Sequence, residues 1–374
     1  MDMLKQFKAL KIPSSLPKIS LKWDPAIFSK LRGKKAETAP LMPSVRMACD
    51  LGKSKVVFVE IEKSADGIKL TKFLKAPRTP GKEAELLKDL LTQGGFASNK
   101  VRISVKGQGV IIRFVSFPQM KLEDLKSSIS FELDQYIPFK SHEVVWDCQI
   151  LEENVTTPTG TGMNVLLVAV KHDDLYATIQ TFQGAGLQIE LIDVDALALA
   201  NVLEFFHPEE VKSTTAILDI GSEISTLNVI HNGRPRFIRD ITYGGMDILK
   251  RLRRKLGLTQ EQALQQIEVD RVPSPEATNV IQEALHDLVS ELRVSLNYYL
   301  DQIHAAEPVK KIFIGGGGAY HPLVIETLTQ NLGFPVEAIQ TIDKIQVGNG
   351  TDANLVKQNQ GLLTVALGLC IREL

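Results

Sequence analysis

Residues 216–230 combine an aspartate, a glycine and hydroxyl side chains in a pattern suited to binding an anion. An apolar run ends in Asp219-Ile220-Gly221, turns through Ser222, and resumes as an apolar run that contains Ser225 and Thr226. This pattern predicts a hairpin. Backbone amides and hydroxyls in such a turn donate to phosphate, and glycine allows close approach of the ligand. The alternative for this segment alone is an ordinary Asp-Gly hairpin with a structural role.

A second stretch repeats this layout about 170 residues earlier. Residues 44–61 run from an apolar strand into Asp50-Leu51-Gly52, turn through Lys53 and Ser54, and continue as an apolar strand. Two copies suggest an internal duplication. We therefore expect two similar lobes that face each other across a cleft, with one hairpin from each lobe gripping a phosphate chain.

A third stretch is rich in glycine. Residues 311–314 predict a buried strand, which leads into Gly315-Gly316-Gly317-Gly318 and then a helix start. Such a junction allows a flat or phosphorylated ligand to approach the backbone closely. The spacing is neither GxGxxG nor GxxxxGK[ST], so it excludes the dinucleotide-binding and P-loop patterns.

The composition is that of a globular protein with more than one domain. The 374 residues are 44% hydrophobic and 23% charged, with a net charge of -1. A charge balance near zero argues against nucleic-acid binding through bulk electrostatics. The cysteines Cys49, Cys148 and Cys370 are far apart and lack metal-ligand spacing, which indicates small buried side chains in a reducing compartment. No signal peptide or membrane span is indicated, so we expect a cytoplasmic protein.

Residues 1–44 form a segment of different character, rich in lysine and proline. We expect a flexible basic arm. Its apolar residues, among them Phe7, Trp23 and Phe28, favour contact with an anionic membrane surface or a partner. A solvated tail is the alternative.

Hydrophobic periodicity places the other elements. It predicts strands over residues 100–105, 110–117, 146–152, 164–170 and 188–193, and helices over residues 83–93, 120–135, 173–183, 196–206, 248–256, 259–267, 277–303 and 362–371. Pro138 ends the helix of residues 120–135. Thr259 with Gln262 three residues later predicts a capping box. The elements between the hairpins form a small α/β module.

The order of these motifs resembles the actin-like ATPases, and most closely the PilM family of type IV pilus assembly proteins. Asp50-Leu51-Gly52, Asp219-Ile220-Gly221-Ser222 and Ile314-Gly315-Gly316-Gly317 match the two phosphate loops and the adenosine loop. Residues 110–120, 131–139 and 364–372 resemble PilM in detail. The resemblance covers residues 45–374, and Gln135-Tyr136-Ile137-Pro138-Phe139 is its most specific part.

The resemblance implies the actin-like α/β fold, with duplicated lobes around a nucleotide cleft and an inserted small subdomain of the 1C type. On this sequence lobe I would comprise residues 45–212 and the terminal helix of residues 360–374. The insert would occupy about residues 121–193. Lobe II would comprise residues 213–359.

The resemblance also implies ATP and magnesium in the cleft. Asp50, Asp219 and Asp193 would approach magnesium, mostly through waters. The phosphate donors would be Gly52, Lys53, Ser54, Gly221, Ser222, Ser225 and Thr226. Gly244 and Gly245 would line the cleft floor, and Gly316, Gly317 and Gly318 would contact the nucleoside.

Two departures from the family bear on nucleotide binding. PilM relatives usually carry lysine where this chain has Val57, so Lys53 or Lys55 would have to replace it. The helix after Thr259 lacks the Glu and Lys that relatives bring to the nucleoside and shows Leu264, Gln265, Gln266 and Ile267 instead. No residue is indicated as a catalytic base, which leaves ATP hydrolysis open.

The partner implied by the resemblance is the N-terminal peptide of a PilN-like inner-membrane protein. Ile137, Pro138, Phe139 and Trp146 would line its groove, with backbone hydrogen bonds at a strand edge. The alternative is that such residues fill the core of the module, which we favour for Phe131, Leu133 and Ile137. The protein would be cytoplasmic and held at the inner membrane by partners, including other platform components or further copies of itself, without nucleic acid.

Two other functions are weighed against this one. The first is an active ATPase or filament former resembling FtsA, with the basic arm as its membrane tether. The second is a sugar kinase of the same superfamily, which would need a sugar-binding insert and a clear catalytic aspartate. The sequence indicates neither of these two features.

Overall fold

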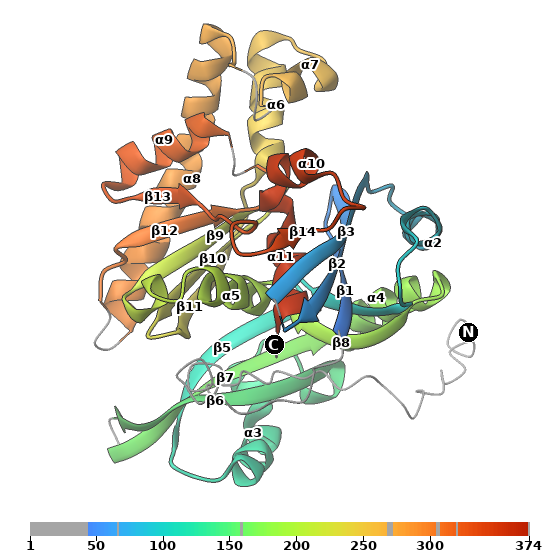
Figure 1. Cartoon of the computed structure of the whole chain (residues 1–374). Coiled ribbons are helices and arrows are strands. Elements are labelled where there is room, and N and C mark those ends of the chain that lie inside the picture. Colours follow the sequence, from blue (N-terminus) through green and yellow to red (C-terminus); the bar gives the residue numbers. More distant parts are fainter. Residues whose placement is uncertain are drawn as a thin grey trace, which may run out of the picture.

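The computed structural model describes residues 44–65, 67–157, 160–267, 272–303, 307–318 and 321–372. The predicted basic arm lies outside these residues except for Ser44. Figure 1 shows large sheets on either side of a central pair of helices, with a smaller sheet below them. The actin-like α/β fold is confirmed.

The first large sheet has the strand order β14-β3-β2-β1-β4-β8. Its strands are β1 (Ser44–Leu51), β2 (Lys55–Ser64), β3 (Gly67–Pro77), β4 (Lys100–Val105), β8 (Gln188–Val194) and β14 (Gln346–Val347). Strands β1, β2 and β3 form an antiparallel meander, and β4 lies parallel to β1. The β1–β2 connection is the first predicted phosphate hairpin, so its turn lies at the carboxyl end of β1 beside β4.

The second large sheet repeats this topology in the order β11-β10-β9-β12-β13. Its strands are β9 (Thr215–Ile220), β10 (Ser225–His231), β11 (Arg234–Ile241), β12 (Lys311–Gly315) and β13 (Val336–Ala338). Again a meander is followed by a strand parallel to its first member. The predicted duplication is therefore present in the strand order.

The register of the duplicated meanders is the same where they approach the cleft. Asp50 pairs with Val57 in the first hairpin, and Asp219 pairs with Thr226 in the second. The partner of Val57 on the third strand is Lys75, and the partner of Thr226 is Asp240. Lys75 and Asp240 consequently occupy equivalent positions in the two lobes.

The small sheet has the order β5-β7-β6 and carries helix α3 on one face. Its elements are β5 (Val110–Pro118), α3 (Leu122–Tyr136), η1 (Ser141–Glu143), β6 (Val144–Thr157) and β7 (Gly160–Lys171). Side chains of β7 point alternately into two hydrophobic cores. Val165 and Leu167 face α3, while Leu166 and Val168 face lobe I. Both faces are buried, which explains its unbroken apolar sequence.

The strand pairing gives the insert different bounds from the predicted residues 121–193. Strand β5 precedes this range yet belongs to the small sheet, and β8 lies inside it yet pairs with β4 of the first large sheet. The insert is therefore better described as residues 106–187. Its last helix, α4 (His172–Gly184), packs against lobe I beside α2 (Glu83–Gly94).

Helices α5 (Asp195–Phe206) and α11 (Gln360–Ile371) lie between the large sheets (Figure 1). Their buried side chains share one core with Val57 and Val59 of lobe I and with Ile217 and Phe313 of lobe II. This core joins the lobes. Helix α10 (Ala353–Gln358) directly precedes α11.

The remaining helices belong to lobe II. They are α6 (Gly245–Leu256), α7 (Gln260–Gln265), α8 (Pro275–Gln302) and α9 (Pro322–Leu332), and η2 (Glu210–Lys212) precedes β9. The predicted capping box of α7 is present: the Thr259 hydroxyl accepts from the Gln262 amide, and the Gln262 side chain accepts from the Thr259 amide.

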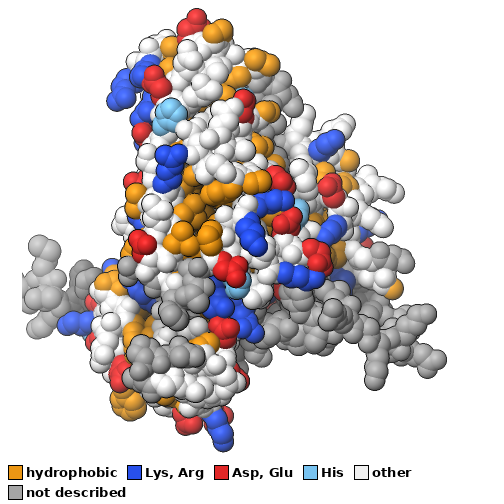
Figure 2. Space-filling view, turned by 90° about the vertical axis from the view of Figure 1, so that its left-hand side faces the viewer, with side chains coloured by type: hydrophobic (Ala, Val, Ile, Leu, Met, Phe, Trp, Pro, Cys, Tyr) orange, Lys and Arg blue, Asp and Glu red, His pale blue; other side chains and the backbone are white. Residues whose placement is uncertain are grey.

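Charges of both signs lie on one face of the molecule. Figure 2 shows acidic and basic side chains interspersed on the face that it displays, with an apolar area near its middle. Among the described residues, no helix combines the length and the hydropathy needed to cross a membrane.

The contact between α5 and α11 gives a test of how closely the lobes are joined. A β-carbon at Gly368 of α11 would lie 2.0 Å from the carbonyl oxygen of Ala198 on α5. Replacing a helical glycine by alanine normally stabilises a helix by about 0.5–1 kcal/mol. Here we expect Gly368→Ala to lower the free energy of unfolding by about 1–3 kcal/mol, because the helices would have to separate.

Chemical denaturation measures this change. Gly350→Ala is the matched control, because a β-carbon there would meet nothing within 4 Å, and it should alter stability by less than about 0.5 kcal/mol. Unchanged or increased stability of Gly368→Ala would show that the helices do not constrain each other as described.

Candidate functional site

A cavity of about 550 Å³ lies between the large sheets, and we call it the cleft. Both predicted phosphate hairpins open into it, together with the glycine loop of Gly315–Gly318 and helices α6 and α7. The predicted ligand residues that line it are Asp50, Gly52, Lys53, Ser54, Asp219, Gly221, Ser222, Thr226, Gly245, Gly316, Gly317 and Gly318. Residues far apart in sequence are thus brought to one cavity, although their contacts with a ligand remain a prediction.

The hairpin turns are tight enough to require glycine. A β-carbon at Gly221 would lie 2.5 Å from the carbonyl oxygen of Ile224, which accepts a hydrogen bond from the Gly221 amide. At the equivalent Gly52, a β-carbon would lie 2.9 Å from the carbonyl oxygen of Lys55. Each turn therefore folds back on its own backbone and leaves the neighbouring residues facing the cleft.

The glycine loop connects the second hairpin to α11. Gly316 has φ +90, and a β-carbon there would lie 2.3 Å from the carbonyl oxygen of Ile220. Its amide donates to the carbonyl oxygen of Gly361 at the start of α11 (2.9 Å). No larger residue fits this position, because both the backbone angle and the close approach exclude a side chain.

Two predicted ligand residues lie behind the cleft wall. A β-carbon at Gly244 would lie 2.5 Å from the backbone of Ser222, so Gly244 supports the second hairpin from outside. The Ser225 side chain is fully buried, and its hydroxyl donates to the carbonyl oxygen of Tyr243 (2.7 Å). Neither residue faces the cleft.

The predicted metal residue Asp193 is not at the cleft. Its side chain is 1% exposed and forms an ion pair with Arg372 beneath the first sheet. Burial raises the pKa of Asp193, and Arg372 opposes this effect. Strand β8 continues to Val194, and the acid that faces the cleft is Asp195, the first residue of α5.

Lys106, which follows β4, is a further cleft residue that the sequence motifs did not indicate. Its ammonium group lies 2.6 Å from the carboxylate of Asp50 and 2.7 Å from that of Asp195. Burial opposes the charge of Lys106, but the two carboxylates outweigh burial and raise the lysine pKa. Lys106 thus neutralises part of the acidic charge in the cleft. A signal was present in the sequence, since Lys106 directly follows the predicted strand of residues 100–105 and precedes the glycine-containing turn that begins at Gly107.

Asp219 faces the cleft without an ion-pair partner among the described residues. Burial, followed by repulsion from Asp195 and Asp50, raises the pKa of Asp219 to about 7. Nearby, Asp240 accepts a hydrogen bond from the Thr226 hydroxyl (2.7 Å), and burial raises the pKa of Asp240. Asp219 and Asp240 therefore leave a local surplus of acidic groups on the lobe II side of the cleft, because the ion pairs of Lys106 involve Asp50 and Asp195 instead.

This surplus of negative charge fits a magnesium ion accompanied by phosphates. Among the described residues, no cluster of three or more acidic, histidine or cysteine side chains forms a metal cage. Magnesium does not need one, because it commonly binds through one or two carboxylates, several waters and phosphate oxygens. Asp219 would hold the ion, with Asp240 beside it, and the ion would neutralise phosphate charge.

The other end of the cleft is apolar. Met246 and Leu249 of α6 and Leu264 of α7, together with Ile267 just after it, line the cavity. Gln266, which the sequence placed in this region, instead accepts a hydrogen bond from the amide of Ser274 (2.9 Å). A flat ring can be held here by apolar contact rather than by charged side chains.

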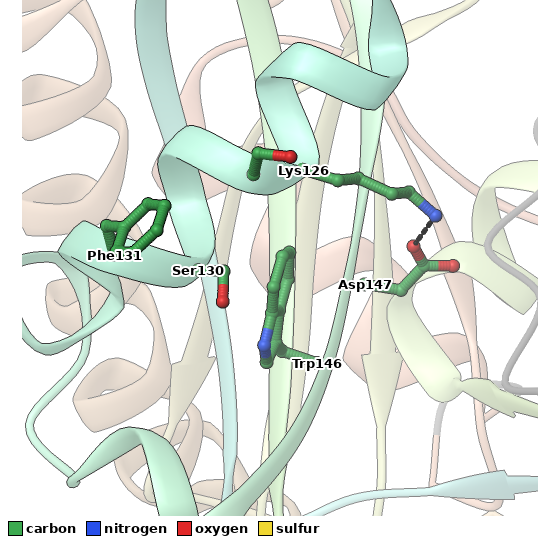
Figure 3. Close-up of a pocket in the computed structure, with 6 residues that line it drawn as sticks. Lys126, Ser130, Phe131, Trp146 and Asp147 are labelled. Carbon is green, nitrogen blue, oxygen red and sulfur yellow. Dashed lines mark ion pairs between the residues drawn. The ribbon is translucent and has the colours of Figure 1, made fainter.

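A second candidate site lies on the insert, in an open depression of about 490 Å³ between α3 and β6. We call it the α3–β6 depression; it is lined by Lys126, Ser127, Ser130, Phe131, Trp146 and Asp147. Figure 3 shows Trp146 rising from β6 beside the helix, with Phe131 further along α3. Lys126 reaches across to Asp147 (2.8 Å).

The four residues predicted to line the peptide groove lie in different environments. Trp146 lines the depression, whereas Ile137 is 5% exposed and fills the core under α3. Pro138 is exposed, and the ring of Phe139 is half-buried under the ammonium group of Lys171 (4.3 Å). The expectation that Leu133 and Ile137 are core residues is confirmed.

The expectation for Phe131 is wrong, because its side chain is 91% exposed. Leu125, Ile129 and Leu133 recur every four residues and are buried. Phe131 lies two residues after Ile129, about 200° around the helix, and therefore points away from the core. The depression therefore combines two aromatic side chains, Phe131 and Trp146, with polar and charged ones.

The outer edge of β6 adds a second binding feature. In the small sheet β6 pairs only with β7 among the described residues, so its other edge is free of a strand partner. An extended peptide can form backbone hydrogen bonds along such an edge.

Duplicated lobes, paired hairpins and a glycine loop at an interlobe cleft define this chain as a protein of the actin-like ATPase fold. Comparison with known proteins gives the family. A model of the type IV pilus assembly protein PilM matches residues 49–374, so the chain belongs to the PilM family.

Solved structures agree with this assignment. The chain is similar to one in a "PilM-PilN type IV pilus biogenesis complex", with 25% sequence identity and a TM-score of 0.77 over 87% of this chain and 98% of the other. It also resembles ethanolamine utilization protein EutJ from Carboxydothermus hydrogenoformans, at 15% identity and a TM-score of 0.52 over 89% and 91% of the two chains. The second likeness concerns the fold alone.

The raised pKa of Asp219 predicts a pH-dependent cost to folding. The folded protein retains this proton to about pH 7, whereas the unfolded chain releases it near the ordinary value of 3.8. The free energy of unfolding therefore falls as the pH rises between these values. Because asparagine cannot ionise, we expect Asp219→Asn to stabilise the unliganded protein by about 1–3 kcal/mol at pH 8 and by less at pH 4.5.

Urea unfolding at the two pH values measures this difference. Asp89→Asn, the same exchange at an exposed position on α2, is the control and should alter stability by less than about 0.5 kcal/mol. A loss of stability in Asp219→Asn at pH 8 would contradict the electrostatic description of the cleft.

Proposed function

We propose that this chain is an actin-like scaffold of the type IV pilus assembly platform. It binds ATP with magnesium in the cleft and the N-terminal peptide of a PilN-like inner-membrane protein on the insert. Its place is the cytoplasm, at the inner membrane through this partner. The observation that carries the proposal is the match to PilM over residues 49–374, together with the similarity to a chain of the PilM-PilN complex.

The arrangement of the cleft supports a nucleotide. Its volume of about 550 Å³ is within the usual range of small-ligand sites, about 300–1,000 Å³. One end offers hairpin amides and hydroxyls together with acidic groups, and the other end offers apolar side chains opposite the glycine loop. This order matches the chemistry of a magnesium triphosphate joined to a flat base.

The α3–β6 depression supports a peptide partner. Phe131 and Trp146 provide apolar contacts, and the free edge of β6 provides backbone donors and acceptors. A short peptide with one or two apolar anchors, running along the edge, would use both features. Because Ile137 is a core residue, the contact surface is centred on Phe131 and Trp146 rather than on Ile137.

Peptide binding can be tested with a labelled synthetic peptide from the N-terminal segment of a PilN-like protein, followed by fluorescence anisotropy. We expect the wild-type protein to bind and Trp146→Ala or Phe131→Ala to weaken binding at least about tenfold, because aromatic anchors dominate such contacts.

The control is Val294→Ala, an exposed apolar side chain on α8, which should bind the peptide as the wild-type protein does. Absence of binding to the wild-type protein would contradict the partner assignment. Equal loss in all three variants would show that the depression is not the docking site. Calorimetric titration with ATP and magnesium tests the nucleotide part separately.

A further inference from the structure

Two lysines approach the cleft from one face of the first large sheet. Lys55 begins β2 and Lys75 lies near the end of β3, and both line the cleft. Lys75 pairs with Val57, which follows Lys55 by two residues. Side chains two apart on a strand share a face, as do directly opposed residues of antiparallel strands. Lys55, Val57 and Lys75 therefore project from the same face.

The positive charge of this pair is uncompensated. Among the described residues, neither lysine forms an ion pair, and the Lys75 ammonium group donates a hydrogen bond only to the neutral Asn359 side chain (2.6 Å). Both side chains are exposed, yet partial desolvation lowers the pKa of both groups, and repulsion by Lys75 lowers that of Lys55 further. Lys106, in contrast, is neutralised by two carboxylates.

The position of Lys75 has an equivalent in lobe II that carries the opposite charge. Asp240 occupies in lobe II the place that Lys75 occupies in lobe I, since each pairs with the residue seven positions after the hairpin aspartate. The cleft therefore has a basic wall on lobe I and an acidic wall on lobe II. An anion carrying a bound cation is complementary to both walls.

We propose that Lys55 and Lys75 form a cationic clamp for the terminal phosphate of a nucleoside triphosphate. The assignment rests on the proposed nucleotide site and adds a selectivity to it: the clamp distinguishes a triphosphate from a diphosphate. Two ammonium groups placed around a phosphate with several acceptor oxygens form charge-assisted hydrogen bonds. Binding also relieves the repulsion between the lysines. Val57, between them, offers the phosphate no charge.

Calorimetry with Lys55→Met and Lys75→Met tests the clamp in the full-length protein. The control is Lys72→Met. Lys72 lies on β3 three residues before Lys75, so its side chain projects from the opposite face of the sheet. With magnesium present, we expect each clamp variant to lose about ten- to hundredfold in affinity for ATP, the range for a hydrogen bond to a charged group. Affinity for ADP should change less than about threefold, and the control should bind both nucleotides as the wild-type protein does.

Other outcomes overturn the assignment. If both clamp variants bind ATP normally, or lose ATP and ADP equally, the lysines do not bind the terminal phosphate. If the wild-type protein binds neither nucleotide, the nucleotide part of the proposed function fails by itself. The clamp is then tested with inorganic tripolyphosphate: wild-type binding that is weakened in Lys55→Met and Lys75→Met, but not in Lys72→Met, supports it, and any other result refutes it.

Discussion

The close crossing of α5 and α11 joins the two lobes between which the cleft lies. Gly368 allows α11 to approach the backbone of α5, and the shared core joins both large sheets to this helix pair. The same helices begin at the cleft: α5 starts with Asp195, and the Gly361 carbonyl near the start of α11 accepts from Gly316 of the glycine loop. A change in the crossing would therefore move an acidic residue and the glycine loop together. The geometry of the site depends on helix packing outside the site.

The lobes keep the same strand order and register, but their cleft residues have diverged. Asp50 and Asp219 are equivalent, yet only Asp50 is neutralised by Lys106. Lys75 and Asp240 are equivalent as well and carry opposite charges. The two lobes share a strand arrangement but differ in their cleft side chains, so the cleft is basic on one side and acidic on the other. This polarity suits a phosphate chain bound to a cation better than either group alone.

Local sequence was sufficient for the features that depend on local geometry. The Asp-x-Gly hairpins, the glycine loop and the capped helix at Thr259 follow from turn and capping chemistry, and all are present. Residues that reach the cleft through pairing of strands far apart in the sequence could not be found from local patterns. Lys106 reaches Asp50 because β4 lies parallel to β1, and Asp195 rather than Asp193 faces the cleft because β8 runs on to Val194. Phe131 is a different case, since the helical spacing of its neighbours already placed it on the outer face.

The two chain connections between lobe I and the insert lie beside the ion pairs of the cleft. The chain leaves the first sheet at Lys106, immediately after β4, and returns through β8 to Asp195. These two residues contact each other, and Lys106 also contacts Asp50 of the first hairpin. A ligand that draws Asp50 or Asp195 away from Lys106 changes the forces on both connections to the insert, because the lysine loses a charged partner. The phosphate end of the cleft therefore lies at the two points where the insert joins lobe I.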